Sequence, residues 1–448
     1  MKIVIGGAGE VGSHLAKLLS EQLHDIVMID PDPDRLAQLE NSLDILTIPG
    51  IPTSIETLTA AQVSKADLFI AVTPSQDSNL VACLLSTRLG VGKTVARIDT
   101  AAFMQKENRS FLSDMGISYM IYPEKIAAKE IASVIRQSTL TDLLDFSGGR
   151  LSLLVLKIDE KSPLVNQTLM TMGATHFQME YRAVAIIRNG KTIIPHGKDF
   201  FQSGDVAYVV SNHTGMRTLL EMSGTKIVNV NNIIILGGSR IARLTARELG
   251  KQYSIKILEQ DRNHALKLSN ELGNALIINA DGTKAEILLE EGLTQTDAFV
   301  ALTGNAETNI LSCIWAKSMG VKRVIAEVEN IDYVALAEKL GIDSVINKKI
   351  IAASNIYRFT LDGEISLMKT MTGAIEAEVF EFVAQPGSRI TQAPVYQLNF
   401  PEEAIIGGVI RGHLGFIVDG QTVIKPNDHV VVFALPQIAS EIGKFFTK

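Results

Sequence analysis

The chain carries one sequence pattern twice. The segment KIVIGGAGEVGSHLAKLL near the N-terminus returns as NIIILGGSRIARLTAREL from Asn232 onward. One spacing, 230 positions, separates a series of identical pairs: Gly7 and Gly237, Thr53 and Thr283, Asp67 and Asp297, Thr73 and Thr303, Asn79 and Asn309, Gly90 and Gly320. Matches that recur at one spacing indicate duplication, so any fold proposed for one half must also serve the other.

The rest of each half corresponds at slightly shorter spacings, which indicates small deletions in the second copy. Gly116 pairs with Gly341 and Arg188 with Arg411, and the turn at 204–205 resembles the turn at 427–428. A length of 448 residues suggests about three domains. The repeat instead predicts four, as a larger unit followed by a smaller one, then both again.

Strands and helices alternate within each larger unit. Apolar strands are predicted at KIVIGG, DIVMID, ADLFIAVT and KTVARID. This alternation predicts an α/β fold with a doubly wound parallel sheet. Thr53 with Glu56, and Thr283 with Glu286, have the spacing of capping boxes at helix starts. The smaller units contain short β-branched runs between turn residues, which predicts small α+β domains.

The predicted domains follow from these units. We expect larger domains at 1–122 and 230–348, crossover helices at 123–146 (with a linker) and 349–365, and smaller domains at 147–224 and 366–448. The helix from Pro123 to about Ser138 and its counterpart around Ile350–Leu361 are amphipathic. In an isolated domain, each would leave an apolar stripe that needs a partner.

Composition excludes several classes of protein. With 46% hydrophobic and 20% charged residues, the chain has the balance of a well-packed globular protein. A net charge of −7 without a basic run argues against nucleic-acid binding. The two cysteines, Cys83 and Cys313, share one repeat position, which favours buried helix residues in a reducing cytoplasm. No apolar run approaches the ~18–20 residues of a membrane helix and no signal peptide is predicted, so any membrane role is expected to be peripheral.

The first glycine-rich turn has the dinucleotide-binding fingerprint. The run GAGEVG, from Gly7 to Gly12, follows a predicted strand and opens a helix. Such glycines allow a tight turn, close approach of a pyrophosphate, and close helix packing. Asp30 ends the next strand, where a carboxylate accepts hydrogen bonds from ribose hydroxyls and repels a 2′-phosphate. The pattern favours NAD(H) over a reading in which Asp30 only caps a helix, because Asp32 and Asp34 are better placed as caps.

The second copy keeps part of this fingerprint. The run GGSRIA, from Gly237 to Ala242, has Ser239 where a pyrophosphate would approach, and Glu259 takes the place of Asp30. Ala is tolerated at the last position, whereas Ser239 adds a side chain beside the phosphate path. Both nucleotide binding with altered preference and an empty cleft therefore stay open for this copy.

The ends of later strands supply further candidates. Thr73, Pro74 and Thr303 lie at the crevice edge where ligands of doubly wound sheets bind. Arg97 ends the following strand and could neutralise a phosphate or form a surface ion pair. Its repeat partner is Glu327, and this charge reversal predicts that the two clefts are not equivalent.

No catalytic group is evident. A dehydrogenase needs a proton-transfer group beside the nicotinamide and a substrate domain. None of the eight histidines recurs at its repeat position, and no HExxH or GxSxG motif is present. The sequence therefore predicts a nucleotide-binding protein that is not an enzyme and holds no metal.

Together these motifs resemble the tandem RCK (KTN) regulatory subunits of Trk potassium-uptake systems. The resemblance rests on GAGEVG with Asp30, AVT at 71–73, NLVAC at 79–83, ARI at 96–98, VAIIRNG and GD in the smaller unit, and the duplication. It implies that each larger unit is a Rossmann domain and each smaller one an RCK C-terminal domain. Carried over by position, the implied NAD-contacting residues are Gly7, Ala8, Gly9, Glu10, Val11, Asp30, Thr73, Pro74 and Arg97, then Gly237, Gly238, Ser239, Arg240, Ile241, Glu259 and Thr303.

The resemblance also implies partners and place. It implies a cytoplasmic subunit at the inner face of the cell membrane, assembled as a homo-oligomeric, tetrameric ring beneath a TrkH- or TrkG-like potassium-transporting subunit. NAD(H), and ATP or ADP as further ligands, would change the gating of that partner. We expect a ligand in the crevice to tilt each Rossmann domain, with the helix from Pro123 to Ser138 and its counterpart as assembly surfaces.

Two alternatives stay open on the sequence. One is an NAD-dependent oxidoreductase with a pocket between the two halves, which turnover of bound NADH would favour. The other is a nucleotide-sensing scaffold without a transporter partner, and co-purification with a membrane protein would argue against it.

Overall fold

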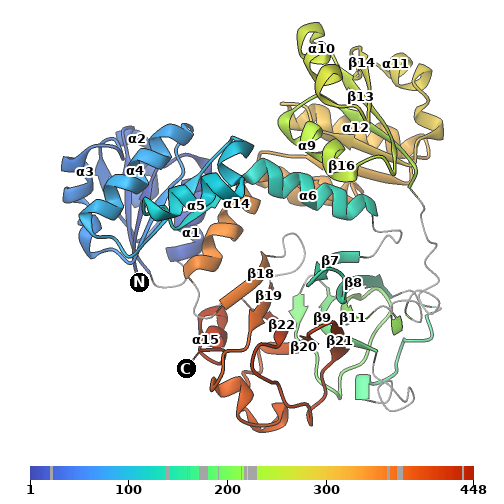
Figure 1. Ribbon diagram of the computed structural model, residues 1–448. Helices are drawn as coiled ribbons and strands as arrows, with labels where there is room; N and C mark the ends of the chain where they lie inside the picture. The colour runs from blue at the N-terminus through green and yellow to red at the C-terminus, as the bar shows by residue number, and fades with distance from the viewer. Residues whose placement is uncertain are drawn as a thin grey trace.

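The chain forms four sheets, two parallel and two antiparallel (Figure 1). The computed structural model describes residues 1–20, 24–136, 142–158, 160, 162–170, 180–189, 191–212, 214–215, 219, 230–360, 364–370, 377–435 and 438–447. The two parallel sheets lie in separate lobes, and the two antiparallel sheets lie together below them in the view of Figure 1.

The first parallel sheet has six strands in the order β3-β2-β1-β4-β5-β6. The strands are β1 (Lys2–Gly6), β2 (Asp25–Asp30), β3 (Leu46–Pro49), β4 (Leu68–Ala71), β5 (Lys93–Arg97) and β6 (Tyr119–Ile121). The helices between them are α1 (Glu10–Ser20), α2 (Pro33–Glu40), α3 (Ile55–Ala60), α4 (Gln76–Leu89) and α5 (Lys106–Asp114). All four residues of β4 are buried, as continuous apolar strands covered on both faces require. The strand order reverses between β1 and β4, which creates a crevice at their carboxyl ends.

The second parallel sheet repeats this topology as β14-β13-β12-β15-β16-β17. Its strands are β12 (Asn232–Leu236), β13 (Ser254–Glu259), β14 (Leu276–Asn279), β15 (Ala298–Ala301), β16 (Arg323–Glu327) and β17 (Ser344–Ile346). Its helices are α9 (Arg240–Leu249), α10 (Arg262–Glu271), α11 (Ala285–Glu290), α12 (Ala306–Ser318) and α13 (Asp332–Lys339). The predicted doubly wound parallel fold is therefore confirmed in both copies.

The paired cysteines face these two cores, as predicted. Cys83 in α4 and Cys313 in α12 are both fully buried. Burial raises the pKa of both thiols, that of Cys313 to about 12. Since the thiolate is the reactive form, these positions serve packing.

Each small unit is an antiparallel five-stranded sheet. The first has the order β10-β9-β11-β8-β7 and the second β18-β19-β22-β20-β21. The strands are β7 (Asp142–Phe146), β8 (Leu151–Lys157), β9 (Tyr181–Arg188), β10 (Lys191–Ile193), β11 (Val206–Ser211), β18 (Glu364–Thr370), β19 (Glu378–Val383), β20 (Ala404–Arg411), β21 (Leu414–Ile417) and β22 (His429–Ala434). A short helix, α15 (Ala439–Gly443), follows the last strand.

The two small sheets share one core. This core joins apolar residues of both units: Phe146, Leu151, Leu153, Val184, Val210, Val379, Ile410, Val431 and Phe433. Since those residues come from both halves of the chain, neither small sheet buries this face alone, and the halves are held together at this level.

The repeat is visible at the atomic scale in the small units. The Nη2 atom of Arg188 lies 2.7 Å from Oδ2 of Asp205, and the Nη2 atom of Arg411 lies 2.7 Å from Oδ2 of Asp428. In each pair the arginine Nε donates a second hydrogen bond of 2.9 Å to the carboxylate. The predicted pairing of these two arginines and these two turns is therefore confirmed.

The crossover helices exchange between the two halves. The helix α6 (Pro123–Arg136) leaves the first domain and packs on α9 of the second (Figure 1). Reciprocally, α14 (Lys348–Tyr357) packs on α1 of the first domain. Arg323 in β16 donates a hydrogen bond to the Val134 carbonyl of α6. Arg136, at the end of α6, donates to the Glu248 carbonyl of α9, and its Nη1 atom lies 3.7 Å from Oε1 of Glu248.

This exchange corrects the predicted use of the crossover helices. The apolar stripe of α6, which includes Ala127, Ile131 and Ile135, is buried in the core of the second parallel sheet. It does not offer a free surface for assembly with another copy, because its partner lies in the same chain. The last residues of that predicted helix, 137–138, lie outside the described residues.

The predicted capping boxes are wrong. The N-cap of α3 is Ser54, one residue after the predicted Thr53, and its hydroxyl accepts the Thr57 N–H at 3.2 Å. The N-cap of α11 is Lys284, whose side chain makes no capping bond. The Thr283 hydroxyl is instead bonded to Asp281 at 2.6 Å, which removes it from the helix end.

Candidate nucleotide-binding clefts

The first fingerprint turn is held by Asp30. Gly7 has a φ of +111°, a region that favours glycine, and its N–H donates to the Ile29 carbonyl at 2.8 Å. The Ala8 N–H donates to Oδ2 of Asp30 at 2.6 Å, and the Asp32 N–H donates to Oδ1 at 2.9 Å. Asp30 is buried, and its two carboxylate oxygens accept these two N–H groups. It therefore fixes the turn that would face a ligand. The prediction that Asp32 caps α2 is confirmed, whereas Asp34 only donates to that cap.

The glycines of this turn have different surroundings. A Cβ atom on Gly9 would meet nothing within 4 Å, so the space over this residue is open. A Cβ atom on Gly12 would lie 1.9 Å from the Gly7 carbonyl oxygen, so α1 can approach the turn only with glycine there. These are the two roles that the fingerprint requires: room for a pyrophosphate and close packing of the helix.

Thr73 lies directly beside the turn. A Cβ atom on Gly7 would come within 3.0 Å of the Thr73 backbone nitrogen. The Thr73 N–H and hydroxyl donate to Oδ1 of Asn79 at 2.9 and 2.7 Å, and the Asn79 side-chain amide donates to the Thr73 and Arg97 carbonyls. The structure therefore brings Gly7, Thr73 and Arg97 to one edge of the sheet.

Asn79 is a residue whose role sequence reasoning missed. It is almost fully buried and ties the ends of β4 and β5 together. Asn309 makes the same bonds to Thr303 and to the Glu327 carbonyl in the second copy. The signal for this role in the sequence is that asparagine stands at this position in both copies.

The second cleft is a cavity of about 280 Å³. Five predicted residues line it: Gly237, Gly238, Ser239, Glu259 and Thr303. His264, Asp281, Gly282 and Thr283 also line it and were not predicted as site residues. The cavity thus lies at the crevice that the repeat predicts, with additional polar side chains.

Ser239 and Glu259 are already engaged within this cleft. The Ser239 hydroxyl caps α9 by accepting the Ala242 N–H at 3.4 Å. Glu259 accepts the N–H groups of Gly238 and Asp261, both at 2.8 Å, and lies 3.3 Å from the His264 ring nitrogen. A phosphate entering this cleft therefore finds one helix N–H already bonded.

Two predicted residues turn their side chains away from the clefts. Val11 and Ile241 are buried among apolar residues of their domains. Only their backbone atoms can face a ligand. This follows from their place on the first turn of α1 and α9, on the face that the exchanged helices cover.

The remaining turn residues reach the other half of the chain. Glu10, at the start of α1, forms an ion pair with Lys349 of α14. Its repeat counterpart Arg240 lies 3.1 Å from Oδ2 of Asp99, just after β5, and donates to the Asp99 carbonyl. Each fingerprint turn is therefore connected to the opposite half by a charged side chain.

Charge also links the strand ends across the halves. The pKa of Glu329 is lowered mainly by its hydrogen bond from Lys348, and the nearby charges of Lys349 and Arg97 add to this effect. Glu327 also pairs with Lys348, at 2.9 Å, but burial raises its pKa. Arg97 of the first half therefore lies near enough to Glu329 of the second half for its charge to contribute to this lowered pKa.

Two family models match both halves of the chain. The TrkA-N domain model matches residues 3–123 and 233–348, and the TrkA-C domain model matches residues 153–224 and 379–447. Among the described residues, no helix is long and apolar enough to cross a membrane.

Curated relatives align over the whole chain. The Trk system potassium uptake protein TrkA homolog 1 of Methanosarcina mazei is 31% identical over 455 residues, covering 100% of both chains. The Trk system potassium uptake protein TrkA of Azorhizobium caulinodans is 31% identical over 456 residues, covering 100% of this chain and 98% of the relative.

Solved structures share the fold. A GsuK channel bound to NAD superposes with a TM-score of 0.59 at 16% identity, over 99% of this chain and 78% of the channel chain. GsuK bound to ADP superposes with a TM-score of 0.51 at 14% identity, over 80% of this chain and 68% of the other.

Proposed function

Because this chain belongs to the TrkA family, we propose that it is a nucleotide-binding regulatory subunit of a potassium-uptake system. It binds NAD(H) in the first cleft, with ATP and ADP as competing ligands, and performs no catalysis. It assembles as a tetrameric ring on the cytoplasmic face of the membrane and gates a TrkH- or TrkG-like potassium-translocating subunit. The structures of GsuK with NAD and with ADP support this choice of ligands.

The observation that carries this proposal is the geometry of the first turn. Gly9 leaves open space at the N-terminus of α1, and Asp30 fixes the Ala8 N–H beside it. A helix N-terminus with a free approach is suited to a pyrophosphate, and the Asp30 carboxylate retains lone pairs for ribose hydroxyls. Thr73, Pro74 and Arg97 at the adjacent strand ends would contact the rest of the dinucleotide.

The second cleft is proposed to bind its ligand more weakly. Ser239 both occupies the approach of a phosphate and uses one N–H of α9. Gly237, Gly238, Glu259 and Thr303 nevertheless line an existing cavity, so an adenine nucleotide with fewer phosphate contacts is the ligand that we expect there.

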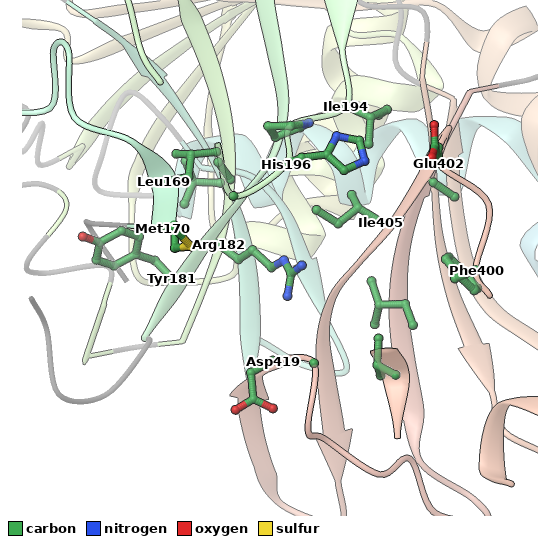
Figure 2. Close-up of a pocket in the computed structure, with 18 of the residues that line it drawn as sticks. Leu169, Met170, Tyr181, Arg182, Ile194, His196, Phe400, Glu402, Ile405 and Asp419 are labelled. Carbon is green, nitrogen blue, oxygen red and sulfur yellow. The ribbon is translucent and has the colours of Figure 1, made fainter. Parts of the chain in front are cut away.

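The oxidoreductase alternative receives no support from the cavity that lies between the halves. The described residues that line this cavity fall in the ranges 156–219 and 395–420, which belong to the small units (Figure 2). None of these described residues belongs to a fingerprint turn, and neither Asp30 nor Glu259 is among them. A nicotinamide held in a Rossmann cleft would therefore not face a substrate bound in this cavity.

Calorimetric titration with NADH, NAD, ATP and ADP tests the first cleft. Gly9→Asp should weaken NADH binding at least about tenfold, because the new carboxylate enters the phosphate path while the free protein has room for it. Ser239→Asp is the matched control at the repeat-related position. It should leave the tightest NADH site unchanged. Undiminished NADH affinity in Gly9→Asp would remove the first cleft from the proposal.

Potassium flux tests the regulatory part. Vesicles that contain the membrane subunit of the same system should show flux that depends on added nucleotide when the wild-type chain is present. With Gly9→Asp, that dependence should be lost while binding of the chain to the vesicles persists. Flux indifferent to nucleotide with the wild-type chain bound would contradict the gating role.

A further inference from the structure

The loop after the third strand of each parallel sheet begins at the same place in both copies. The Gly50 N–H donates to the Asp30 carbonyl at 3.0 Å, and the Ala280 N–H donates to the Glu259 carbonyl at 3.1 Å. Each loop therefore starts directly beside the acidic residue that ends the second strand.

The contact beneath each loop is also equivalent, with large and small residues exchanged. In the first copy, a Cβ atom on Gly6 would lie 2.9 Å from Cβ of Pro52. In the second copy, Leu236 stands in the place of Gly6, and a Cβ atom on Gly282 would lie 2.5 Å from Cδ1 of Leu236. Both loops therefore pack on the end of the first strand of their sheet.

Ile51 and Asp281 occupy the same position in these two loops. Asp281 lines the second cavity. Its Oδ1 atom accepts the Thr283 hydroxyl at 2.6 Å and the Thr283 N–H at 3.2 Å, and these two bonds lower the pKa of Asp281. Its Oδ2 atom lies 4.0 Å from Nζ of Lys284, so it keeps lone pairs for a ligand. Ile51 is 54% exposed and offers only alkyl surface.

The order of the strands indicates which part of a nucleotide reaches this position. In both sheets the second strand lies between the first and the third, as β3-β2-β1 and β14-β13-β12. Phosphates belong at the helix N-terminus after the first strand, and the ribose belongs at the acidic residue that ends the second. A ligand that continues in this direction places its base at the end of the third strand, beside Ile51 or Asp281.

Purine bases differ in the group on carbon 6. Adenine carries an amino group there, which donates hydrogen bonds, whereas guanine and hypoxanthine carry a carbonyl oxygen, which accepts them. A carboxylate only accepts, so it pairs with the amino group but leaves a carbonyl oxygen unpaired. An alkyl side chain pairs with neither group and can cover the face of any purine.

We propose that this loop position sets the base specificity of the two clefts. In the first cleft, Ile51 packs on the purine and accepts adenine and hypoxanthine alike. In the second cleft, Asp281 accepts a hydrogen bond from the adenine amino group and discriminates against bases with a carbonyl on carbon 6. This inference rests on the proposed nucleotide binding and adds which bases each cleft accepts.

Calorimetry on the full chain with NADH and reduced nicotinamide hypoxanthine dinucleotide tests the first cleft. The two affinities at the tightest NADH site of the wild type should agree within about threefold. Ile51→Asp should create a preference for NADH of at least about tenfold, because it introduces the carboxylate of the second copy.

Ile55→Asp is the matched control for this variant. It adds the same charge at a residue of α3 that is 55% exposed. Its repeat counterpart, Ala285, is not among the described residues that line the second cavity. Ile55→Asp should therefore create no preference between the two dinucleotides.

The second cleft is tested with the first one disabled by Gly9→Asp. In that protein, ADP should bind at least about tenfold more tightly than inosine diphosphate. Adding Asp281→Ile should bring the two affinities within about threefold of each other. A preference for ADP that survives Asp281→Ile, or loss of all ADP binding in Gly9→Asp, would remove the second cleft from the inference.

The outcomes for the first cleft separate this inference from the proposed function. Suppose that NADH binds to the wild type and that Gly9→Asp weakens it. An unchanged ratio of the two dinucleotides in Ile51→Asp would then overturn the base specificity while nucleotide binding stands. A preference for NADH above tenfold in the wild type, or one created by Ile55→Asp, would overturn it as well. Absence of NADH binding to the wild type would overturn both the inference and the proposed function.

Discussion

Gly9 and Gly12 lie three residues apart and face opposite surroundings. We expect Gly12→Ala to lower the free energy of unfolding by about 1–3 kcal/mol, since its Cβ would lie 1.9 Å from the Gly7 oxygen. Gly9→Ala should change it by no more than about 0.5 kcal/mol, because its Cβ meets nothing within 4 Å. Urea unfolding of both variants checks this difference, and equal midpoints would contradict it.

The buried carboxyl group of Glu378 should make the stability of the protein depend on pH. It is buried in β19, and burial raises its pKa from an ordinary 4.5 to about 8. The folded chain therefore holds a proton that the unfolded chain releases between these values. Stability from this group is complete below pH 4.5 and is lost as the pH rises, at about 1.4 kcal/mol per pH unit.

The variant Glu378→Gln isolates this effect. Its free energy of unfolding should fall less steeply than that of the wild type between pH 5 and 8, and it should be the more stable protein at pH 8. Denaturant unfolding at several pH values measures both slopes. Parallel slopes in the two proteins would show that Glu378 does not carry the dependence.

The site residues that the sequence predicts correctly are those whose positions follow from one local pattern. Gly7, Gly12 and Asp30 have fixed spacings around one strand, turn and helix, and the structure places them together. Asn79 and Ser239 could not be assigned in this way. The role of Asn79 depends on two strand ends that meet only in the folded sheet, and Ser239 can either cap a helix or face a ligand.

Because α6 packs against the second domain, a mutation of its apolar face should destabilise that domain. Ile131 belongs to α6 but is fully buried in the core of the second parallel sheet. Ile131→Ala should therefore cost about 2–5 kcal/mol, and the cost should appear in the second domain. The only tryptophan, Trp315 in α12, reports on that domain by its fluorescence.

Two controls accompany this measurement. Lys129→Ala changes an exposed residue of the same helix and should leave the Trp315 transition in place. Ile356→Ala removes the corresponding contact of α14 with the first domain and should affect that domain more. A Trp315 transition unaffected by Ile131→Ala would show that α6 does not support the second domain in solution.

The sequence indicated that α6 and α14 need apolar partners but not which ones. The repeat gives α1 and α9 similar buried faces, so each crossover helix has two candidate partners of the same kind. The choice depends on where the chain runs after β6 and β17, which no local pattern specifies. The sequence also did not predict the short strands β3 and β6. Each has only three or four residues, no residue of β3 is buried, and only the last residue of β6 is buried.

For the whole molecule, the exchange predicts how separated halves behave. A chain of residues 1–224 contains α1 and α6 but neither α9 nor α14, so two copies should pair with α6 of each on α1 of the other. We expect a dimer by light scattering, and a mixed dimer when 1–224 and 230–448 are produced together. A monomeric 1–224 chain with native helix content would contradict this expectation.

On the ribosome, α1 emerges more than 300 residues before α14, the helix that covers it. At about 5–20 residues per second, the interval is roughly 15–65 s. During this time Leu15 and Leu19 lack their native partner helix, while nascent copies on the same messenger already display α6. We therefore expect pairing between neighbouring nascent chains to compete with folding within one chain, so that the order of synthesis affects how much native protein forms.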